Sequence, residues 1–511
     1  MFARVISAAV IGIDAELIEV QCDVARGFPG FSVVGLPEKE VTESRERIRS
    51  AIKNSGCSFP TTRITANLAP ADLRKEGVGL DLPIALGLII ASQQLPVPAK
   101  RYLILGELAL NGEVRAVKGA LPIALRASVD GNIDGIILPL DNAAEAALVE
   151  EIPVYPVLTL SEAIKLLSEE VEPTPFSIDR EAAWSAAVSY ETDFAEIKGQ
   201  QQAKRALEVA ATGDHSVLMV GPPGAGKSML SRRFPTIQPP LSFKEALNTT
   251  KIYSIIGMIP PGQPLVTTRP FRAPHHTISY AGMVGGGGGI PRPGEITLAH
   301  HGVLFLDELP EFDRHVLETL RQPLEDREIV ISRAGVSVCY PADFMLLAAM
   351  NPCPCGHLGD KERECRCTSQ EIRRYRKRIS GPFLDRIDIF IEVPRLTSEE
   401  LLSRPTGESS AAIRSRVETA RELRAKRLAK EETKSKKSDH IIKEEIERRE
   451  FDSEGRKLLE MAIDHFGLSA RGYTRLLRVA RTIADLSASA LIRAEHLSEA
   501  IQYRSIDEDL L

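Results

Sequence analysis

Residues 216–228 read SVLMVGPPGAGKS, a short apolar run followed by a glycine-rich loop. The loop fits the pattern G-x-x-x-x-G-K-[ST], with a strand-like run before it and the helix-compatible SMLSRRF after it. Glycines let successive backbone N–H groups turn inward around phosphate oxygens, and the N-terminus of the following helix adds partial positive charge. The stretch therefore predicts a nucleoside triphosphate site, with a lysine reaching the β- and γ-phosphates and a serine ligating Mg²⁺. Its phosphate-binding residues are Gly221, Gly224, Gly226, Lys227 and Ser228.

Two further apolar runs end on polar side chains. VLFLDE places Asp307 and Glu308 at the carboxyl end of a predicted strand, and MLLAAMN ends on Asn351. An acidic side chain there can hold Mg²⁺ together with Ser228, and its neighbour can polarise a water. We therefore predict Mg²⁺ ligation by Ser228 and Asp307, water activation by Glu308, and orientation of that water by Asn351.

The length and charge of the chain limit the class of protein. At roughly 150 residues per domain, 511 residues predict about three domains. The net charge of -6 excludes a globally basic nucleic-acid coat, so any nucleic-acid site has to be a local patch. Apolar runs stay short of the roughly 20 residues that span a bilayer, and the N-terminal segment lacks a signal-peptide cleavage site. We expect a cytoplasmic protein with no membrane association.

The pattern along the chain predicts an α/β protein with four segments. Strand-like and helical runs alternate over residues 1–171, and a proline-containing linker covers 172–194. Residues 195–395 combine buried strands with crossover helices, which predicts a parallel sheet. Residues 396–511 are helical and highly charged, as expected of a helical lid, with a solvated loop at KEETKSKKSDH.

Four of the seven cysteines fall in one short stretch, at Cys353, Cys355, Cys365 and Cys367. A loop reversal would bring the two pairs together, and four thiolates satisfy tetrahedral Zn²⁺. The C-x-C spacing is tighter than the usual C-x₂-C, so a disulfide or buried free thiols are the alternatives. A structural zinc would fix the loop that follows Asn351, with His357 as a bystander.

The motifs GPPGAGKS, RPFRAPHHTISYAG, PGEITLAHHGVLFLDELPEF, LLAAMNPCPCG, ISGPFLDRIDI and LSARGYTRLLRVARTIADL resemble the YifB/ComM group of magnesium-chelatase-like AAA+ ATPases. The resemblance covers essentially the whole chain. It implies an ATP- and Mg²⁺-dependent hexameric ring that acts as a DNA helicase or translocase, promoting branch migration in homologous recombination during natural transformation. It also implies that Arg386 is an arginine finger supplied to a neighbouring subunit, and that Arg471 is the second nucleotide sensor.

The N-terminal segment resembles the proteolytic domain of Lon, in KEGVGLDLPIALGLIIAS and LGELALNGEVRAVKGALPIALRA. Lon carries its nucleophilic serine in a G-P-S-A-G stretch, whereas this chain reads Gly77-Val78-Gly79-Leu80-Asp81. A lysine is also missing from the expected catalytic place. Without a Ser–Lys dyad no peptide nucleophile is activated, so we expect a scaffold used in ring assembly or DNA contact.

Three stretches could touch DNA. Residues 326–344 predict a hairpin turning at 332–335, and in related ring motors a hairpin here reaches the pore, so Arg333 is the leading phosphate contact; a solvated turn residue is the alternative. The second stretch is a glycine run that cannot pack a core and is expected to form a mobile loop. It consists of Gly285, Gly286, Gly287, Gly288 and Gly289. The third is the basic run IRRYRKRISGP, which could instead serve a subunit interface or solvent.

Three functions remain open at this point. A DNA motor acting on single-stranded or branched DNA without sequence preference is favoured by arginine and glycines at the pore positions. A chelatase-type or protein-remodelling motor would instead carry an aromatic pore residue. A nucleotide-dependent scaffold is disfavoured, because Glu308 and Arg386 are both present. No role for His275 and His276 follows from their sequence context.

Overall fold

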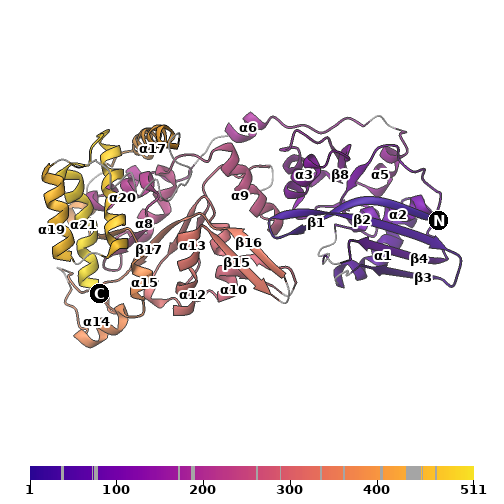
Figure 1. Cartoon of the computed structure of the whole chain (residues 1–511). Helices are drawn as coiled ribbons and strands as arrows, with labels where there is room; N and C mark the ends of the chain where they lie inside the picture. The colour runs from indigo at the N-terminus through magenta and orange to yellow at the C-terminus, as the bar shows by residue number, and fades with distance from the viewer. Residues whose placement is uncertain are drawn as a thin grey trace.

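The structure is a computed structural model of the chain. It describes residues 1–35, 39–71, 73, 79–170, 173–185, 190–259, 263–287, 289–333, 336–360, 363–402, 407–432, 451, 453–466 and 469–510. Figure 1 shows an N-terminal part built on one large sheet, and a second part in which another sheet is flanked by the C-terminal helices.

The N-terminal part is built on a mixed seven-stranded sheet of order β3-β4-β2-β1-β5-β8-β9. Its long antiparallel pair β1 and β2 predominantly alternates buried and less buried residues, as expected where one face of a sheet packs on a core. The strands are β1 (Phe2–Ile11), β2 (Asp14–Ala25), β3 (Gly30–Val34), β4 (Arg63–Ala69), β5 (Tyr102–Ile104), β8 (Gly135–Pro139) and β9 (Val154–Val157).

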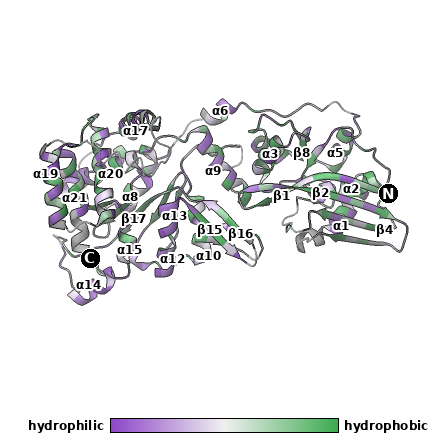
Figure 2. Ribbon diagram, in the orientation of Figure 1, coloured by the Kyte–Doolittle hydropathy of each residue, from purple (hydrophilic) through white to green (hydrophobic). Residues whose placement is uncertain are grey.

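Helices cover this sheet. All of α2 is buried, and apart from Asp81 at its start its side chains are apolar around the whole circumference. Figure 2 shows the contrast between such apolar elements and hydrophilic ones such as α13 and α14. The N-terminal helices are α1 (Lys39–Asn54), α2 (Asp81–Ala91), α3 (Ala120–Val129), α4 (Leu140–Ala146) and α5 (Leu160–Leu167), with a small ribbon of β6 (Glu107–Leu108) and β7 (Val114–Arg115).

The segment expected to be a linker is more ordered than its composition indicates. It contains α6 (Arg180–Ser185), and Phe176 forms an isolated bridge with Val154 of β9. The ring of Phe176 is partly buried and packs against the apolar core of the N-terminal part. The chain then enters the second part through η1 (Phe194–Glu196).

The second part is organised by a five-stranded sheet of order β11-β14-β17-β10-β18 in which every neighbouring pair is parallel. Its central strands are apolar throughout because helices cover both faces. The strands are β10 (Val217–Val220), β11 (Phe271–Arg272), β14 (Val303–Leu306), β17 (Met345–Met350) and β18 (Ile389–Glu392).

Short helices connect these strands. They are α7 (Gln201–Gly213), α8 (Lys227–Arg233), η2 (Phe234–Ile237), α9 (Phe243–Ile256), α10 (Tyr280–Val284), α11 (Glu295–Leu298), η3 (Leu309–Glu311), α12 (Arg314–Thr319), α13 (Arg321–Asp326), α14 (Ser369–Arg376) and α15 (Gly381–Leu384). Two ribbons project from the sheet: β12 (Gly285–Gly286) with β13 (Arg292–Pro293), and the hairpin of β15 (Glu328–Arg333) with β16 (Val336–Pro341).

The C-terminal helices pack directly on the second sheet. They are α16 (Ser398–Leu402), α17 (Ser410–Glu432), α19 (Ser453–Phe466), α20 (Ala470–Leu486) and α21 (Ala494–Leu510). One buried cluster joins Val217 and Ile389 of the sheet to Val417, Leu477 and Leu497 of these helices. The predicted lid therefore shares a core with the sheet. Most of the predicted loop at 430–440 lies outside the described residues.

The two parts meet through α9. Leu241, Ala246 and Leu265 belong to the same apolar cluster as Leu103 and Leu121 of the N-terminal part. Ser254 of α9 donates a 2.8 Å hydrogen bond to the Glu145 carboxylate and accepts one from the Gly119 N–H. Glu145 is buried, which raises the pKa of its carboxyl group, and the Ser254 and Asn142 donors oppose that rise.

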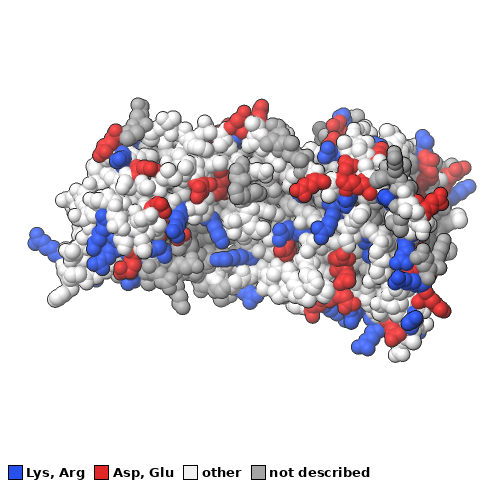
Figure 3. All heavy atoms as spheres, turned by 180° about the vertical axis from the view of Figure 1, so that it is seen from behind, with Lys and Arg blue, Asp and Glu red and all other residues white. Residues whose placement is uncertain are grey.

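The predicted fold class is confirmed: the protein is α/β, with a parallel sheet after residue 195 and a helical C-terminal region. On the face opposite to that of Figure 1, lysine and arginine side chains are interspersed with aspartate and glutamate (Figure 3). No helix among the described residues is long and apolar enough to cross a bilayer.

Ser254→Ala should destabilise the junction between the two parts, because the buried Glu145 carboxylate loses a hydrogen-bond donor. We expect a loss of about 1 to 3 kcal/mol, measured as a lower denaturation midpoint. Ser498→Ala is the matched control, since its exposed hydroxyl bonds only within its own helix, to the Ala494 carbonyl. Equal midpoints for the two variants would contradict the prediction.

Candidate functional site

The glycine-rich loop connects β10 to α8 at the carboxyl edge of the parallel sheet. Gly224 and Gly226 have φ of 78° and 95°, a left-handed conformation that L side chains rarely adopt. A β-carbon at Gly221 would lie 2.1 Å from the Val393 carbonyl oxygen, so the loop passes against β18 only with glycine there. The loop therefore has the shape that lets a phosphate approach the backbone closely.

Lys227 opens α8, and its ammonium group points back into the loop. It donates to the Gly221 carbonyl at 2.6 Å, to the Pro222 carbonyl at 3.0 Å and to Asn351 Oδ1 at 3.1 Å. Burial lowers the pKa of Lys227, while the nearby charges of Asp307 and Glu308 act against that shift. The structure thus brings together Lys227 and Asn351, which the sequence places far apart.

Ser228 and the acidic pair meet at the same edge. The Ser228 hydroxyl donates to Asp307 Oδ2 at 2.6 Å. A hydroxyl and a carboxylate oxygen side by side are hard ligands of the kind that Mg²⁺ takes, so these residues fit the predicted ion. Glu308 follows with a left-handed backbone, φ 53°, and its N–H donates to Asp307 Oδ1 at 3.0 Å.

Arg386 and Arg471 lie at the other end of the sheet. Arg386 Nη2 is 2.9 Å and Arg471 Nη2 is 3.1 Å from the same Glu325 carboxylate oxygen. The Ser216 hydroxyl, just before β10, donates to the Arg386 carbonyl at 2.8 Å. Because Lys227 follows the opposite end of β10, the structure does not bring these arginines together with the glycine-rich loop of their own chain.

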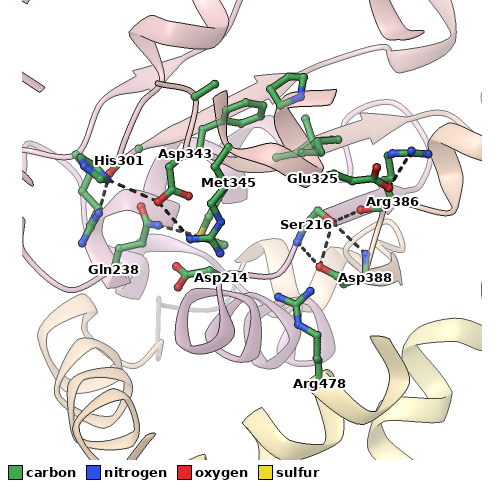
Figure 4. A pocket seen from close by; sticks show the side chains of 18 of the residues that line it. Asp214, Ser216, Gln238, His301, Glu325, Asp343, Met345, Arg386, Asp388 and Arg478 are labelled. Atoms are coloured by element: carbon green, nitrogen blue, oxygen red, sulfur yellow. Dashed lines mark hydrogen bonds and ion pairs between the residues drawn. The ribbon is translucent and has the colours of Figure 1, made fainter. Parts of the chain in front are cut away.

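The amino edge borders a charged cavity of about 570 Å³. Figure 4 shows Ser216, Arg386 and Asp388 close together in its lining, with Glu325 beside Arg386. Asp388 accepts from the Ser216 N–H at 3.1 Å and lies 3.5 Å from Arg475. Burial alone would raise the pKa of Asp388. The hydrogen bond and charge of His215, together with the charges of Arg478 and Arg475, outweigh it and hold that pKa well below its usual range.

The four cysteines come together, as the spacing predicts. Cys353 Sγ lies 3.4 Å from Cys355 Sγ and 3.6 Å from Cys365 Sγ, and all four sulfurs, with that of Cys367, lie within 4.8 Å of one another. These separations are too long for a disulfide of about 2.05 Å. They suit a tetrahedron of Zn–S bonds of about 2.3 Å, whose S–S edges are about 3.8 Å. Gly356, which follows Cys355, lies close to the phosphate loop: a β-carbon there would be 2.6 Å from Pro223 Cδ.

The two predicted DNA elements lie side by side. A β-carbon at Gly286 would be 3.8 Å from Arg333 Nη2, and one at Gly285 would be 2.7 Å from Ile331 Cδ1. Arg333 is exposed and ends β15 rather than sitting within the turn, whose residues 334 and 335 lie outside the described residues. Gly285 and Gly286 form β12 instead of a wholly irregular loop, because they pair with β13. Gly288 is also outside the described residues, whereas Gly287 and Gly289 are described.

The N-terminal part supports this hairpin. The β1–β2 turn packs on β16, since a β-carbon at Gly12 would lie 2.4 Å from Val338 Cγ1.

In the Lon-like stretch, Asp81 is buried and accepts from Arg47 Nε at 2.8 Å and from the Leu108 N–H at 3.3 Å. Gly77 and Val78 lie outside the described residues. Asp81 is therefore tied into an ion pair that anchors α2.

Two residues at the site received no role from the sequence. Glu325 joins Arg386 to Arg471, and no sequence signal marks it because the three lie on separate helices or loops. His276 Nδ1 lies 3.4 Å from Glu308 Oε2. The conspicuous APHHT motif could have directed attention to His276, but not to its partner.

The parallel sheet, the phosphate loop after β10 and the acidic pair at the end of β14 together define a P-loop nucleotide-binding core. Three family models match the chain: "Subunit ChlI of Mg-chelatase" over residues 20–142, "Magnesium chelatase, subunit ChlI" over 193–401, and "Magnesium chelatase, subunit ChlI C-terminal" over 407–504.

Individual proteins agree with the family models. The chain is 44% identical to the competence protein ComM of Haemophilus influenzae, covering 99% of this chain and 97% of that protein. It is also 44% identical to YifB of Escherichia coli K12, covering 98% of this chain and 97% of that protein. Lon protease 2 of Bacillus subtilis is 29% identical over 189 residues, 32% of this chain and 33% of that protein. The chain therefore belongs to the YifB/ComM group of magnesium-chelatase-like AAA+ ATPases. Membership implies ATP and Mg²⁺ as its cofactors.

Proposed function

We propose that this protein is an ATP-hydrolysing ring motor that moves along DNA and promotes branch migration in homologous recombination during natural transformation. The observation that carries the DNA assignment is the contact between the exposed Arg333 and the glycine ribbon at Gly286. In the proposed motor, Arg333 would supply charge to a phosphate, and the glycines would leave the backbone of that strand room to approach. The Haemophilus relative is named as a competence protein, which supports the same process.

The chemistry of ATP hydrolysis follows from the carboxyl edge of the sheet. Lys227 would carry the charge facing the β- and γ-phosphates, and its contact with Asn351 ties that residue to the reacting end of the nucleotide. Ser228 and Asp307 would hold Mg²⁺, which supplies positive charge to the phosphate oxygens. Glu308, adjacent to Asp307, would accept a proton from the attacking water.

Assembly would complete the site. Arg386 and Arg471 share Glu325 at the edge opposite the phosphate loop, so in a head-to-tail ring they would face the nucleotide of the next subunit. Compensation of charge on the γ-phosphate would then depend on ring closure. We propose a homo-hexamer, with the Lon-like part of residues 1–171 as a scaffold, residues 172–194 as the connection, residues 195–395 as the ATPase core and residues 396–511 as the helical lid.

The cysteine cluster would hold one structural Zn²⁺. The sulfur separations suit tetrahedral coordination, and Cys353 is fully buried. Because Gly356 packs on Pro223 and Cys353 follows closely after Asn351, the metal would hold the wall of the nucleotide pocket.

A chelatase-type motor acting on a polypeptide is the second candidate, and the matched family models favour it by name. A polypeptide-driven motor needs no phosphate contacts at its pore. It would therefore show an ATPase rate that is insensitive to DNA, which separates it from the DNA motor.

Lys227→Ala should abolish ATP binding, whereas Glu308→Gln should retain ATP and stop turnover. The first substitution removes the charge that meets the phosphates, and the second removes only the proton acceptor. Lys251→Ala, which breaks a distant ion pair with Asp14, serves as the control. Fluorescent-nucleotide binding and phosphate release measure the two steps. Normal hydrolysis by E308Q would refute the assignment of Glu308.

Purified protein should contain about one zinc ion per chain by elemental analysis, since four thiolates complete one tetrahedral site. Cys365→Ser should lose most of the metal and weaken ATP binding. Cys339→Ser, at an exposed cysteine outside the cluster, should leave both unchanged. Metal-free wild-type protein with four reactive thiols in its native state would rule out the zinc site.

Arg333→Ala should lower the affinity for unrelated DNA sequences by similar factors, because a phosphate contact carries no base information. The slope of log affinity against log salt should fall by about 0.7 to 0.9 for each lost contact. Arg327→Ala, at the base of the same hairpin, removes the same charge away from the glycine ribbon and is the control. Wild-type DNA binding by R333A would remove the hairpin from the translocating machinery.

A further inference from the structure

A histidine pair lies beside the acidic pair. His275 and His276 follow β11, the edge strand that pairs with β14, and their ring centroids are 4.0 Å apart. His276 Nδ1 lies 3.4 Å from Glu308 Oε2, and the His276 ring also meets Phe312 edge-on at 6.4 Å. The imidazole thus lies against the tilted ring of His275 and the edge-on ring of Phe312, with one nitrogen next to the carboxylate.

The backbone of Glu308 is held by hydrogen bonds, whereas its side chain is largely exposed. Its N–H donates to Asp307 Oδ1 at 3.0 Å, and its carbonyl accepts from the Glu311 N–H at 2.8 Å. The side chain is 56% exposed, so little packing selects among its rotamers. The His276 imidazole beside one carboxylate oxygen restricts those rotamers, because any rotamer that moves the oxygen away loses the attraction between the two groups.

The adjacent His275 begins a chain of contacts that leads to the glycine ribbon. The Ile278 N–H donates to the His275 carbonyl at 3.0 Å, and Ser279 caps α10 by accepting from the Gly282 N–H at 3.1 Å. Tyr280, the first residue of α10, stacks on His315 at 5.1 Å. The helix ends at Gly285 in β12, beside the hairpin of Arg333. These contacts give a displacement of β12 a short route along α10 to His275, the neighbour of His276.

We propose that His276 is a positioning residue for hydrolysis: it holds the Glu308 carboxylate in its working place and transmits to it the state of the glycine ribbon. The inference rests on the proposed role of Glu308. A proton acceptor works only within hydrogen-bond reach of its water, and a misplacement of about 1 Å can cost about 100-fold in rate. Nucleic acid that displaces β12 at Arg333 therefore changes the rate of ATP hydrolysis through His276.

The first test is the steady-state ATPase of the full chain with ATP and Mg²⁺. We expect His276→Ala to lower kcat by about 10- to 100-fold and to change KM by about twofold at most, because positioning and not ATP binding is lost. His276→Asn keeps an N–H donor near the place of Nδ1 and should recover most of kcat. Lys251→Ala is the control, because it removes only an ion pair with Asp14 of the N-terminal part, so kcat should stay within about threefold of wild type.

The second test is the ratio of ATPase rates with and without an oligodeoxythymidine strand. His276→Ala should bring this ratio close to one, and His276→Asn should restore it. A wild-type rate that does not respond to the strand overturns the proposed DNA motor, and the coupling with it. A ratio for H276A equal to that of wild type overturns the coupling alone.

The outcomes separate the two levels of the argument. An unchanged or raised kcat in H276A, with E308Q inactive, overturns the positioning role alone. A kcat for H276N as low as that of H276A also overturns it, because the ring would then matter only for packing. Normal hydrolysis by E308Q overturns the proposed function, and this inference with it.

Discussion

The parallel pairing of β17 with both β10 and β14 is the constraint on which the site depends. It brings the carboxyl ends of three strands, which are distant in sequence, to one edge of the sheet. The phosphate loop follows β10, the acidic pair follows β14, and Asn351 follows β17. Lys227 can then bridge the loop and Asn351, while Ser228 meets Asp307. Without this strand pairing, the residues that follow β10, β14 and β17 would lie in separate polar loops and would not form one site.

The same geometry gives the protein two chemically different edges. The carboxyl edge holds a lysine that is buried among oxygen acceptors. The amino edge gathers arginines whose charges are offset by Glu325 and Asp388. A subunit with a phosphate-binding edge and an arginine-bearing edge is complementary to a copy of itself in a head-to-tail arrangement. This complementarity is the physical basis for the proposed ring.

Much of the nucleotide site could be predicted from the sequence, because its signals are local. The run VLFL is β14 and MLLAAM is β17, since fully buried parallel strands read as continuous apolar stretches. The convergence of Arg386 and Arg471 on Glu325 could not be predicted, because it depends on how α13 packs against the C-terminal helices. The ribbon at Gly285 and Gly286 was expected to be mobile, since glycine-rich composition does not reveal its pairing with β13. The contact between His276 and Glu308 depends on the adjacency of β11 and β14, which strand prediction alone does not provide.

The core shared between the central sheet and the last helices has a consequence for biosynthesis. Leu497, Ala500 and Tyr503 of α21 belong to the cluster that contains Val217 and Ile389, so the final stretch of the chain supplies part of the core that covers the sheet. The N-terminal sheet largely encloses its own apolar residues and can condense while the ribosome is still translating the second part. The second part, by contrast, keeps apolar surface of its core exposed until α21 has been translated. A nascent chain that stalls before α21 exposes the apolar side of β18 and becomes a substrate for chaperones or aggregation.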